Sequence, residues 1–120
     1  MKSYTRFFKV LSDPTRLSIV FLLAKGELCV CQIEAALKVH QAKISRHLAY
    51  LRKHGIVKVR SQWKWKHYSL FKPRDKFEMG ILRCLQECLA NDELFESYFT
   101  QMRKCVSRPL DRVVKIARKL

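Results

Sequence analysis

The hydrophobic positions between residues 41 and 53 recur with helical spacing. Ile44, Leu48 and Leu51 stand at i, i+4 and i+7, which places them on one face of a helix that packs inward. Gly55 follows a basic last turn and is a typical helix stop signal. The polar face of this helix could simply be solvated, and the pattern alone fits that alternative equally well. The polar residues near the helix start are also suited to the major groove of DNA: Gln41, Ala42, Lys43, Ser45, Arg46 and His47. The segment is therefore predicted to be a recognition helix.

Two β-rich runs follow this helix directly. β-Branched and aromatic residues open one run at 56–59 and recur in a second at 65–70, with a short basic turn between them. A hairpin in this position is the wing of a winged helix. Neither Asn-Gly nor Asp-Gly is present, so the sequence does not fix the loop type or the register. The tip is predicted to contact phosphates or a minor groove through basic side chains, Lys64 and Lys66, flanked by Lys58 and Arg60.

The remaining apolar patterns predict further helices. Asp13 is a candidate side-chain cap and Pro14 suits a first helical turn, so a core helix begins there and continues to about residue 24. Shorter patterns predict helices at 3–10 and 75–90. The fold class is mainly α with a β-hairpin wing, with residues 1–90 as a winged helix-turn-helix domain for DNA binding and sensing. Residues 91–120 are predicted to be a helical extension of that domain, with an apolar pattern recurring at 110–120.

The net charge of +15 is concentrated in the proposed DNA-binding region. Residues 38–76 hold 12 lysines and arginines against one aspartate, whereas residues 77–99 hold one arginine against five acidic residues. Neutralising phosphates releases counterions and drives binding, so a polyanion is the natural partner of such a surface. An anionic membrane surface would also attract it, but the winged pattern favours double-stranded DNA.

Neither a membrane span nor a signal peptide is expected from this sequence. No apolar run approaches the ~20 residues that cross a bilayer, and the charged, aromatic N-terminal segment does not resemble a signal peptide. We therefore expect a cytoplasmic protein of one domain with no membrane partner. Its five cysteines are then expected to be reduced thiols rather than a disulfide framework.

Cys29 and Cys31 lie at the expected start of a helix that precedes the recognition helix. A helix N-terminus stabilises a thiolate, and thiolates are soft ligands that favour soft ions. On a regular helix, side chains two positions apart in the sequence point about 200° apart around the helix axis. Both cysteines can therefore face one ion only if the first turn unwinds. We expect ion binding to distort this turn and move the recognition helix, which would lower DNA affinity. Packing as two small buried hydrophobes is the alternative.

Four ordered blocks of this sequence resemble the ArsR/SmtB family of metal- and metalloid-responsive repressors: LSDPTRLSIVFLL at 11–23, ELCVCQI at 27–33, KISRHLAYLRKHGIV at 43–57 and WKHYSL at 65–70. ELCVC is similar to the start of the sensing helix in the arsenical repressors. The combination is much more specific than any single block. The resemblance implies a homodimer whose dimer helices lie near 3–10 and 75–90. It also implies a repressor, not an enzyme, that needs no cofactor to bind operator DNA.

The resemblance further implies an inducer that binds Cys29 and Cys31. As(III) or Sb(III) is expected, with Cd(II) and Pb(II) as alternatives and Zn(II) as a weaker one, because no typical zinc spacing is present. Trivalent arsenic binds three thiolates, and arsenical repressors often have a third cysteine where this chain has Glu34. The third ligand is left open between a non-protein group and the remaining thiols, Cys84, Cys88 and Cys105. Cys84 and Cys88 share one helical face, but their apolar stripe favours packing in a dimer interface over a second metal site.

Two other functional classes use the same thiols. A redox or reactive-sulfur sensor would change the oxidation state of Cys29 and Cys31 instead of binding an ion. A thiol reductase is disfavoured because the chain has no CxxC in a βαβ setting and no Gly-rich cofactor loop.

Overall fold

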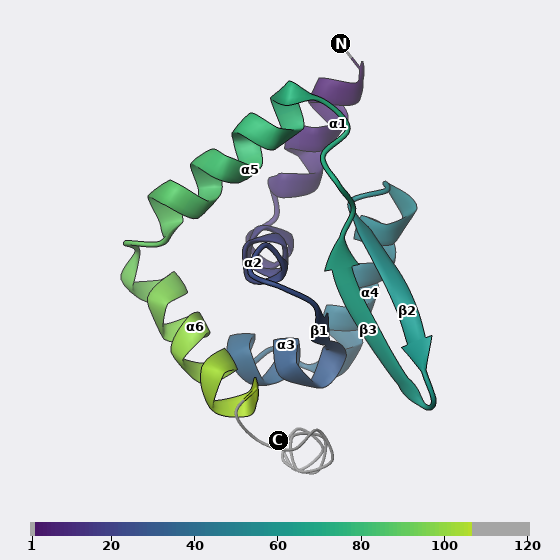
Figure 1. Cartoon of the computed structure of the whole chain (residues 1–120), viewed down its shortest axis with the longest axis vertical. Coiled ribbons are helices and arrows are strands. Elements are labelled where there is room, and N and C mark those ends of the chain that lie inside the picture. The colour runs from purple at the N-terminus through teal and green to yellow at the C-terminus, as the bar shows by residue number, and fades with distance from the viewer. Residues whose placement is uncertain (1, 107–120) are drawn as a thin grey trace.

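The computed structural model describes residues 2–106, of which residues 2, 94, 99 and 102–106 are described by their backbone alone. The pattern predicted at 110–120 therefore lies outside the described residues. The other helices surround a central helix, α2, and a three-stranded sheet lies at one side (Figure 1). In chain order the elements are α1 (Lys2–Leu11), α2 (Pro14–Leu23), β1 (Leu28–Cys29), α3 (Val30–Leu37), α4 (Gln41–Lys53), β2 (Val57–Gln62), β3 (Trp65–Leu70), α5 (Lys76–Leu89) and α6 (Glu93–Val106). The predicted fold class is confirmed.

Helix α2 begins as its sequence predicts. The Asp13 carboxylate accepts hydrogen bonds from the backbone N–H groups of Thr15, at 2.8 Å, and Arg16, at 3.1 Å. Pro14 occupies the first turn, where its missing N–H costs nothing. From Ser18 to Leu23 every residue is buried, so α2 packs on all sides rather than along one stripe. The nearly continuous apolar run from Ser18 to Leu23 thus accounts for the central position of α2.

Helices α3 and α4 form the predicted helix-turn-helix. Ile44, Leu48 and Leu51 have no exposed surface, as their spacing predicts. Each such side chain contributes about 1.5–3 kcal/mol through burial. The opposite face of α4 is thereby directed outward.

The wing is a hairpin of β2 and β3 with a two-residue loop. The strands pair antiparallel from Val57 opposite Leu70 to Gln62 opposite Trp65. A third strand, β1, pairs with β3 through Leu28 opposite Tyr68 and Cys29 opposite His67. The sequence did not predict β1, because a strand of two residues has no recognisable periodicity. As a result the wing is joined by backbone hydrogen bonds to the segment that precedes α3.

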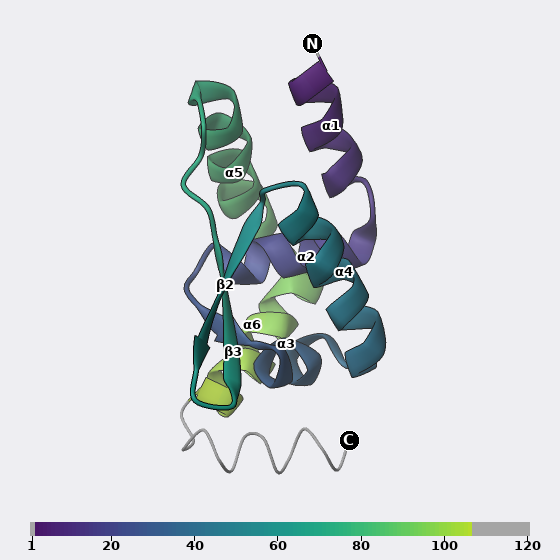
Figure 2. The same cartoon turned by 90° about the vertical axis from the view of Figure 1, so that its right-hand side faces the viewer.

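Contacts made by α5 and α6 complete the structure. Helices α1 and α5 lie side by side (Figure 2), with the Phe77 ring against those of Tyr4, Phe7 and Phe8 at centroid distances of 4.5–5.9 Å. Helix α6 packs against α3 and α2, where the Phe95 ring lies 4.8 Å from that of Phe21. Among the described residues no helix is long and apolar enough to cross a bilayer.

Replacing Gly55 with alanine is expected to destabilise the fold. Gly55 has φ +72°, and an added Cβ would meet the Arg74 guanidinium. That group donates hydrogen bonds to the carbonyl oxygens of His54 and Gly55 at 3.3 and 3.2 Å, which ties the end of α4 to the segment before α5. The left-handed backbone alone should lower the free energy of unfolding by about 1–2 kcal/mol, measured by urea denaturation.

Gly80→Ala is the matched control for this prediction. Gly80 lies inside α5, has no positive φ, and an added Cβ would meet nothing within 4 Å. Its replacement should stabilise the helix by up to about 1 kcal/mol. Equal stability of the two variants would contradict the conformation assigned to Gly55.

Candidate metal and nucleic-acid site

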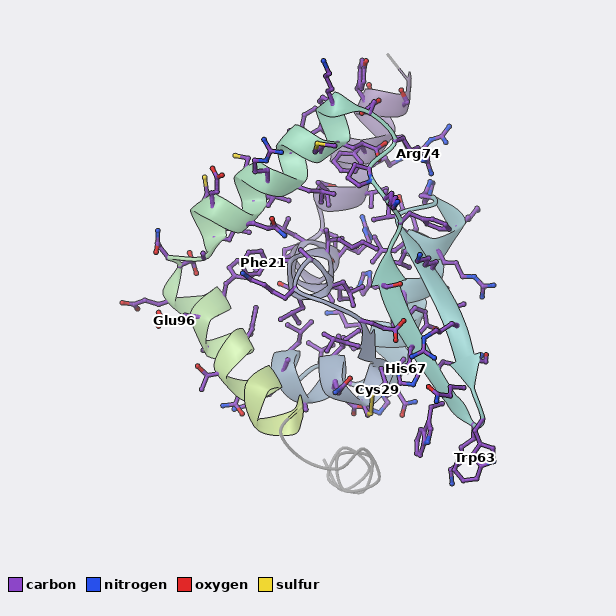
Figure 3. The ribbon with its side chains drawn as sticks, viewed as in Figure 1. Phe21, Cys29, Trp63, His67, Arg74 and Glu96 are labelled. Atoms are coloured by element: carbon purple, nitrogen blue, oxygen red, sulfur yellow. A yellow bond between two sulfur atoms is a disulfide. The ribbon has the colours of Figure 1, made fainter. Side chains whose placement is uncertain are left out.

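Cys29 and Cys31 lie at the junction of β1 and α3. Cys29 has an extended backbone, with φ −86° and ψ 164°, and is the N-cap of α3, whereas Cys31 lies in the first helical turn. Their Cα atoms are 5.4 Å apart and their sulfurs form a disulfide (Figure 3). The prediction of reduced thiols is therefore wrong for this pair in the structure. The predicted separation of about 200° is wrong because Cys29 is not helical. The cysteine backbones therefore allow the two sulfurs to meet without the predicted unwinding of the first turn.

Short connections join this cysteine pair to the wing. Cys29 pairs with His67 of β3, and its backbone N–H donates to Gln32 Oε1 at 2.9 Å. Two residues earlier, Glu27 accepts hydrogen bonds from Arg60 of β2, the shortest at 2.7 Å. These hydrogen bonds lower the pKa of Glu27. Arg60, predicted to flank the DNA-contacting tip, is thus engaged with the segment before Cys29.

A cavity of about 430 Å³ opens beside the cysteines, between β1, α3, α4 and the wing. This cavity is lined both by residues predicted to bind the ion and by residues predicted to contact DNA. The predicted ion ligands and four of the predicted DNA-contacting residues line it: Cys29, Cys31, Gln41, Ser45, Lys64 and Lys66. Glu34, at the position where arsenical repressors often have a cysteine, also lines this cavity. The side chains predicted to bind the ion and four of those predicted to contact DNA therefore line one cavity.

The predicted recognition face of α4 divides into two groups. Gln41, Ala42, Lys43, Ser45 and Arg46 are exposed, so they are available to a partner.

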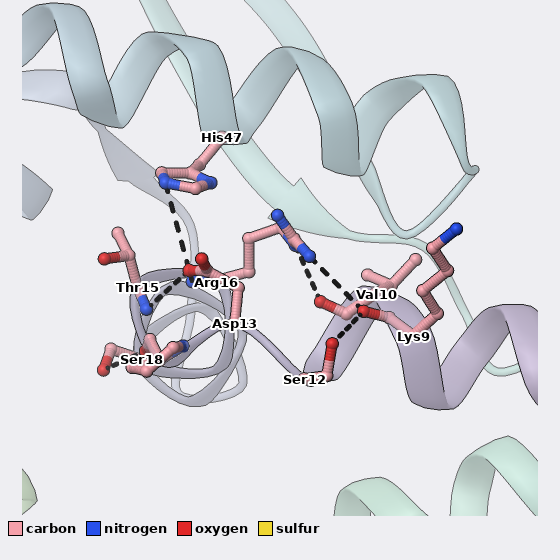
Figure 4. Close-up of polar contacts among 9 residues, drawn as sticks. Lys9, Val10, Ser12, Asp13, Thr15, Arg16, Ser18 and His47 are labelled. Carbon is pink, nitrogen blue, oxygen red and sulfur yellow. Dashed lines mark hydrogen bonds and ion pairs between the residues drawn. The ribbon is translucent and has the colours of Figure 1, made fainter.

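His47 instead turns toward α2. It is half-buried, and its Nε2 lies 3.9 Å from the Asp13 carboxylate that caps α2 (Figure 4). Arg16, from the same turn of α2, donates to the carbonyl oxygen of Val10 at 2.8 Å and lies 4.2 Å above the Tyr50 ring. His47 thus takes part in a polar contact between α2 and α4. The other five residues of the predicted recognition face are exposed instead.

This placement predicts a pH dependence of stability. Burial lowers the pKa of His47; Asp13 opposes the shift and Arg16 adds to it. Because the folded-state pKa is depressed, the unfolded chain takes up a proton first as the pH falls. The free energy of unfolding should be highest above about pH 6.5 and decrease below it.

Urea denaturation at about pH 7.5 and about pH 5.5 measures this effect. The midpoint should be lower at the acidic pH, and the difference should shrink in His47→Asn. Part of it should remain, because burial also lowers the pKa of His54. Equal pH differences in the wild type and in His47→Asn would contradict the assignment to His47.

Trp63 is a wing residue that sequence reasoning missed. It lies in the hairpin loop, is 81% exposed and has φ +59°, a conformation that residues other than glycine seldom adopt. The Lys64 ammonium lies 4.6 Å from the Trp63 ring centroid and 5.2 Å from that of Trp65. The signal was an apolar aromatic residue next to Lys64 at a predicted hairpin tip. The tip therefore combines a large exposed ring with cationic side chains.

The other cysteines do not join the Cys29–Cys31 pair within the described residues. Cys84 and Cys88 are exposed on α5, with their sulfurs 3.8 Å apart, and this contact raises the pKa of Cys88. Both views show α5 apart from α3 (Figures 1 and 2). The side chain of Cys105 lies outside the described ones. Across the described part of the chain, no three His, Cys, Asp or Glu side chains converge as a metal site.

Comparisons with known proteins identify relatives of this chain. Residues 13–59 match a family model described as bacterial regulatory protein, arsR family. The chain is 56% identical over 66 residues to an arsenical resistance operon repressor of Escherichia coli, which covers 54% of this chain and 56% of that protein. It thus spans little more than half of that relative. It is 44% identical over 92 residues to an arsenic resistance transcriptional regulator of Pseudomonas putida, covering 72% of each.

A solved structure has the same fold. HlyU from Vibrio cholerae superposes with a TM-score of 0.67 at 24% identity, covering 75% of this chain and 95% of that one. At this identity the similarity concerns the fold alone.

Proposed function

Because the chain belongs to the arsR family of bacterial regulatory proteins, we propose that it is a transcriptional repressor released from operator DNA by a thiophilic ion. As(III) or Sb(III) would bind Cys29 and Cys31, with Cd(II), Pb(II) and Zn(II) as weaker candidates. The observation that supports this most directly is the shared cavity, which is lined by both thiols and by side chains proposed to contact DNA.

DNA binding is proposed for the exposed face of α4 and for the wing. A helix of this kind enters the major groove with its N-terminal residues at the base edges. The wing would supply phosphate or minor-groove contacts through Lys64 and Lys66. We assign these contacts to the exposed side chains and to the wing lysines: Gln41, Ala42, Lys43, Ser45, Arg46, Lys64 and Lys66. His47 would act through its contact with Asp13 and keep α4 in position.

The two thiols fit part of an As(III) site. Thiolates are the soft ligands that such an ion requires, and the Cα atoms of the two cysteines lie 5.4 Å apart, close enough for their sulfurs to meet. An ion held there would share the cavity with Gln41, Ser45 and the wing lysines. DNA and ion would thus favour different arrangements of the same side chains, and by linkage each would weaken the binding of the other.

A homodimer is proposed through α1 and α5. Large apolar side chains remain exposed on these two helices, namely Tyr4 at 43%, Phe8 at 53% and Met79 at 45%. No residue of α5 is buried within the described chain. A second copy would cover this surface, and a two-fold axis would present two recognition helices to a palindromic operator.

A second candidate function is supported by the disulfide itself. Peroxide would oxidise the two thiols to the Cys29–Cys31 disulfide with release of two water molecules, and the structure holds that oxidised state. The chain would then be a redox-sensing regulator.

Fluorescence anisotropy of a labelled fragment of the gene's own promoter tests both candidates. The protein is reduced with a phosphine, bound to the fragment and titrated with arsenite, cadmium, zinc or peroxide. Arsenite is expected to weaken DNA binding about 5- to 150-fold, the usual range of coupling between two sites. Release by peroxide alone would replace the ion-binding account with the redox one. Persistent binding with every reagent would refute both.

A further inference from the structure

We propose that the cavity beside Cys29 and Cys31 binds a small anionic thiol, which supplies the third sulfur to As(III). This inference rests on the proposed function, since it concerns the ion held by the same two cysteines. It assigns the cavity a ligand class: a low-molecular-weight thiol with one or more carboxylates.

The described part of the chain supplies fewer sulfur ligands to this site than As(III) requires. As(III) in a thiolate site forms three bonds to sulfur, and the cavity provides two cysteines. Glu34, which also lines the cavity, offers a carboxylate oxygen, a hard ligand that a soft ion does not favour. Cys84 and Cys88 lie on α5, apart from this site (Figures 1 and 2). Among the described side chains no third thiol lines the cavity, so a third sulfur can enter from solvent.

The cavity has room for a small molecule beside the ion. The cavity of about 430 Å³ lies within the range of roughly 300–1,000 Å³ that small-molecule sites occupy. An ion bound by two sulfurs fills little of such a volume. Trp65 and Tyr68, both half-buried, give it an apolar wall that suits the carbon chain of a thiol.

The side chains that line the cavity carry a net positive charge. Lys64 and Lys66 line the cavity against the single carboxylate of Glu34. Lys64 is held over the rings of Trp63 and Trp65, which positions its ammonium group at this wall. Two lysines opposite one acidic residue favour a ligand that brings its own carboxylate. A neutral or cationic thiol would lack this attraction.

The bonding balances without an oxidant. Arsenous acid, As(OH)₃, reacts with the two reduced cysteine thiols and one small thiol. Three As–S bonds form, three As–O bonds break and three water molecules leave, and arsenic remains trivalent. The Cys29–Cys31 disulfide must first be reduced, for which the experiment uses a phosphine. The bound thiol would then occupy the space beside Gln41, Ser45 and the wing lysines, so DNA and the ternary ligand would compete.

The test compares two thiols that differ in charge alone. Reduced protein bound to labelled promoter DNA is titrated with arsenite in the presence of N-acetylcysteine or of its neutral amide. The anionic thiol should lower the arsenite concentration for half release by about tenfold, as two exposed lysine–carboxylate contacts allow. Native mass spectrometry should find the protein with one arsenic and one N-acetylcysteine. Equal release with both thiols, or an adduct without the small thiol, would overturn the inference while leaving arsenite release intact.

A gain-of-function variant supplies the complementary test. In Glu34→Cys the chain provides its own third sulfur one helical turn after Cys31, so release should become independent of the added thiol. Cys105→Ser should keep the wild-type preference for the anionic thiol; loss of release in this variant would assign the third sulfur to Cys105 and refute the small-thiol site. Failure of arsenite to release DNA with any thiol would instead refute the proposed function.

Discussion

Replacing Cys29 or Cys31 with serine is expected to abolish release by arsenite while leaving DNA affinity within about twofold of the wild type. Neither cysteine is assigned a DNA contact, so the free protein should bind the promoter fragment normally. Without one sulfur the ion loses a soft ligand, and a hydroxyl does not replace it. The entire coupling of about 5- to 150-fold should disappear in an anisotropy titration.

Cys84→Ser is the matched control for these variants. Cys84 lies on α5, in the proposed dimer surface and away from the cavity, so a variant that is still dimeric by size-exclusion chromatography should respond to arsenite as the wild type does. Cys29 is only 3% exposed, and a buried hydroxyl could lower stability. Cys31 is less buried, so Cys31→Ser provides an independent test in a folded protein. Release by arsenite from both folded variants would show that the ion binds elsewhere.

Long, strongly patterned elements could be predicted from the sequence. The positions of Ile44, Leu48 and Leu51 identified α4, and all three are fully buried. Asp13 and Pro14 marked the start of α2 because their chemistry suits a helix N-terminus. In each case a local rule determines the structure, and the tertiary fold agrees with it.

Features that depend on contacts distant in sequence could not be predicted. Cys29 was assigned to a helix because its pairing with His67, 38 positions further along the chain, leaves no local pattern. The helical geometry then suggested that the two thiols point apart, whereas the extended backbone at Cys29 brings them together. His47 has the spacing of an exposed recognition residue, yet Asp13 of a neighbouring helix draws it inward.

The position of Cys29 in the sheet changes how sensing could reach DNA. The predicted route passed from the cysteines through α3 to α4. The structure shows a shorter connection from the cysteines to the wing, because Cys29 pairs with β3 and Glu27 binds Arg60 of β2. A change in the backbone at Cys29 would therefore act on the wing directly. Wing and recognition helix meet again at the cavity, so both routes end at the same side chains.

Replacing Lys64 and Lys66 together with alanine is expected to weaken DNA binding by roughly 100-fold at low salt. Each lysine would lose one charge-assisted contact with a phosphate. The slope of log affinity against log salt concentration should become less steep by about 1.8, since each phosphate contact on duplex DNA accounts for about 0.9. Because phosphates are the same in every sequence, operator and random fragments should lose affinity equally.

Lys76→Ala is the control, since Lys76 is also an exposed lysine but begins α5, away from the wing. It should leave both the affinity and the salt slope nearly unchanged. A double wing variant with the wild-type slope would mean that the hairpin does not contact phosphates. A loss confined to the operator fragment would instead assign base contacts to the wing. Either result would transfer the phosphate contacts to α4, where Lys43 and Arg46 are the exposed cations.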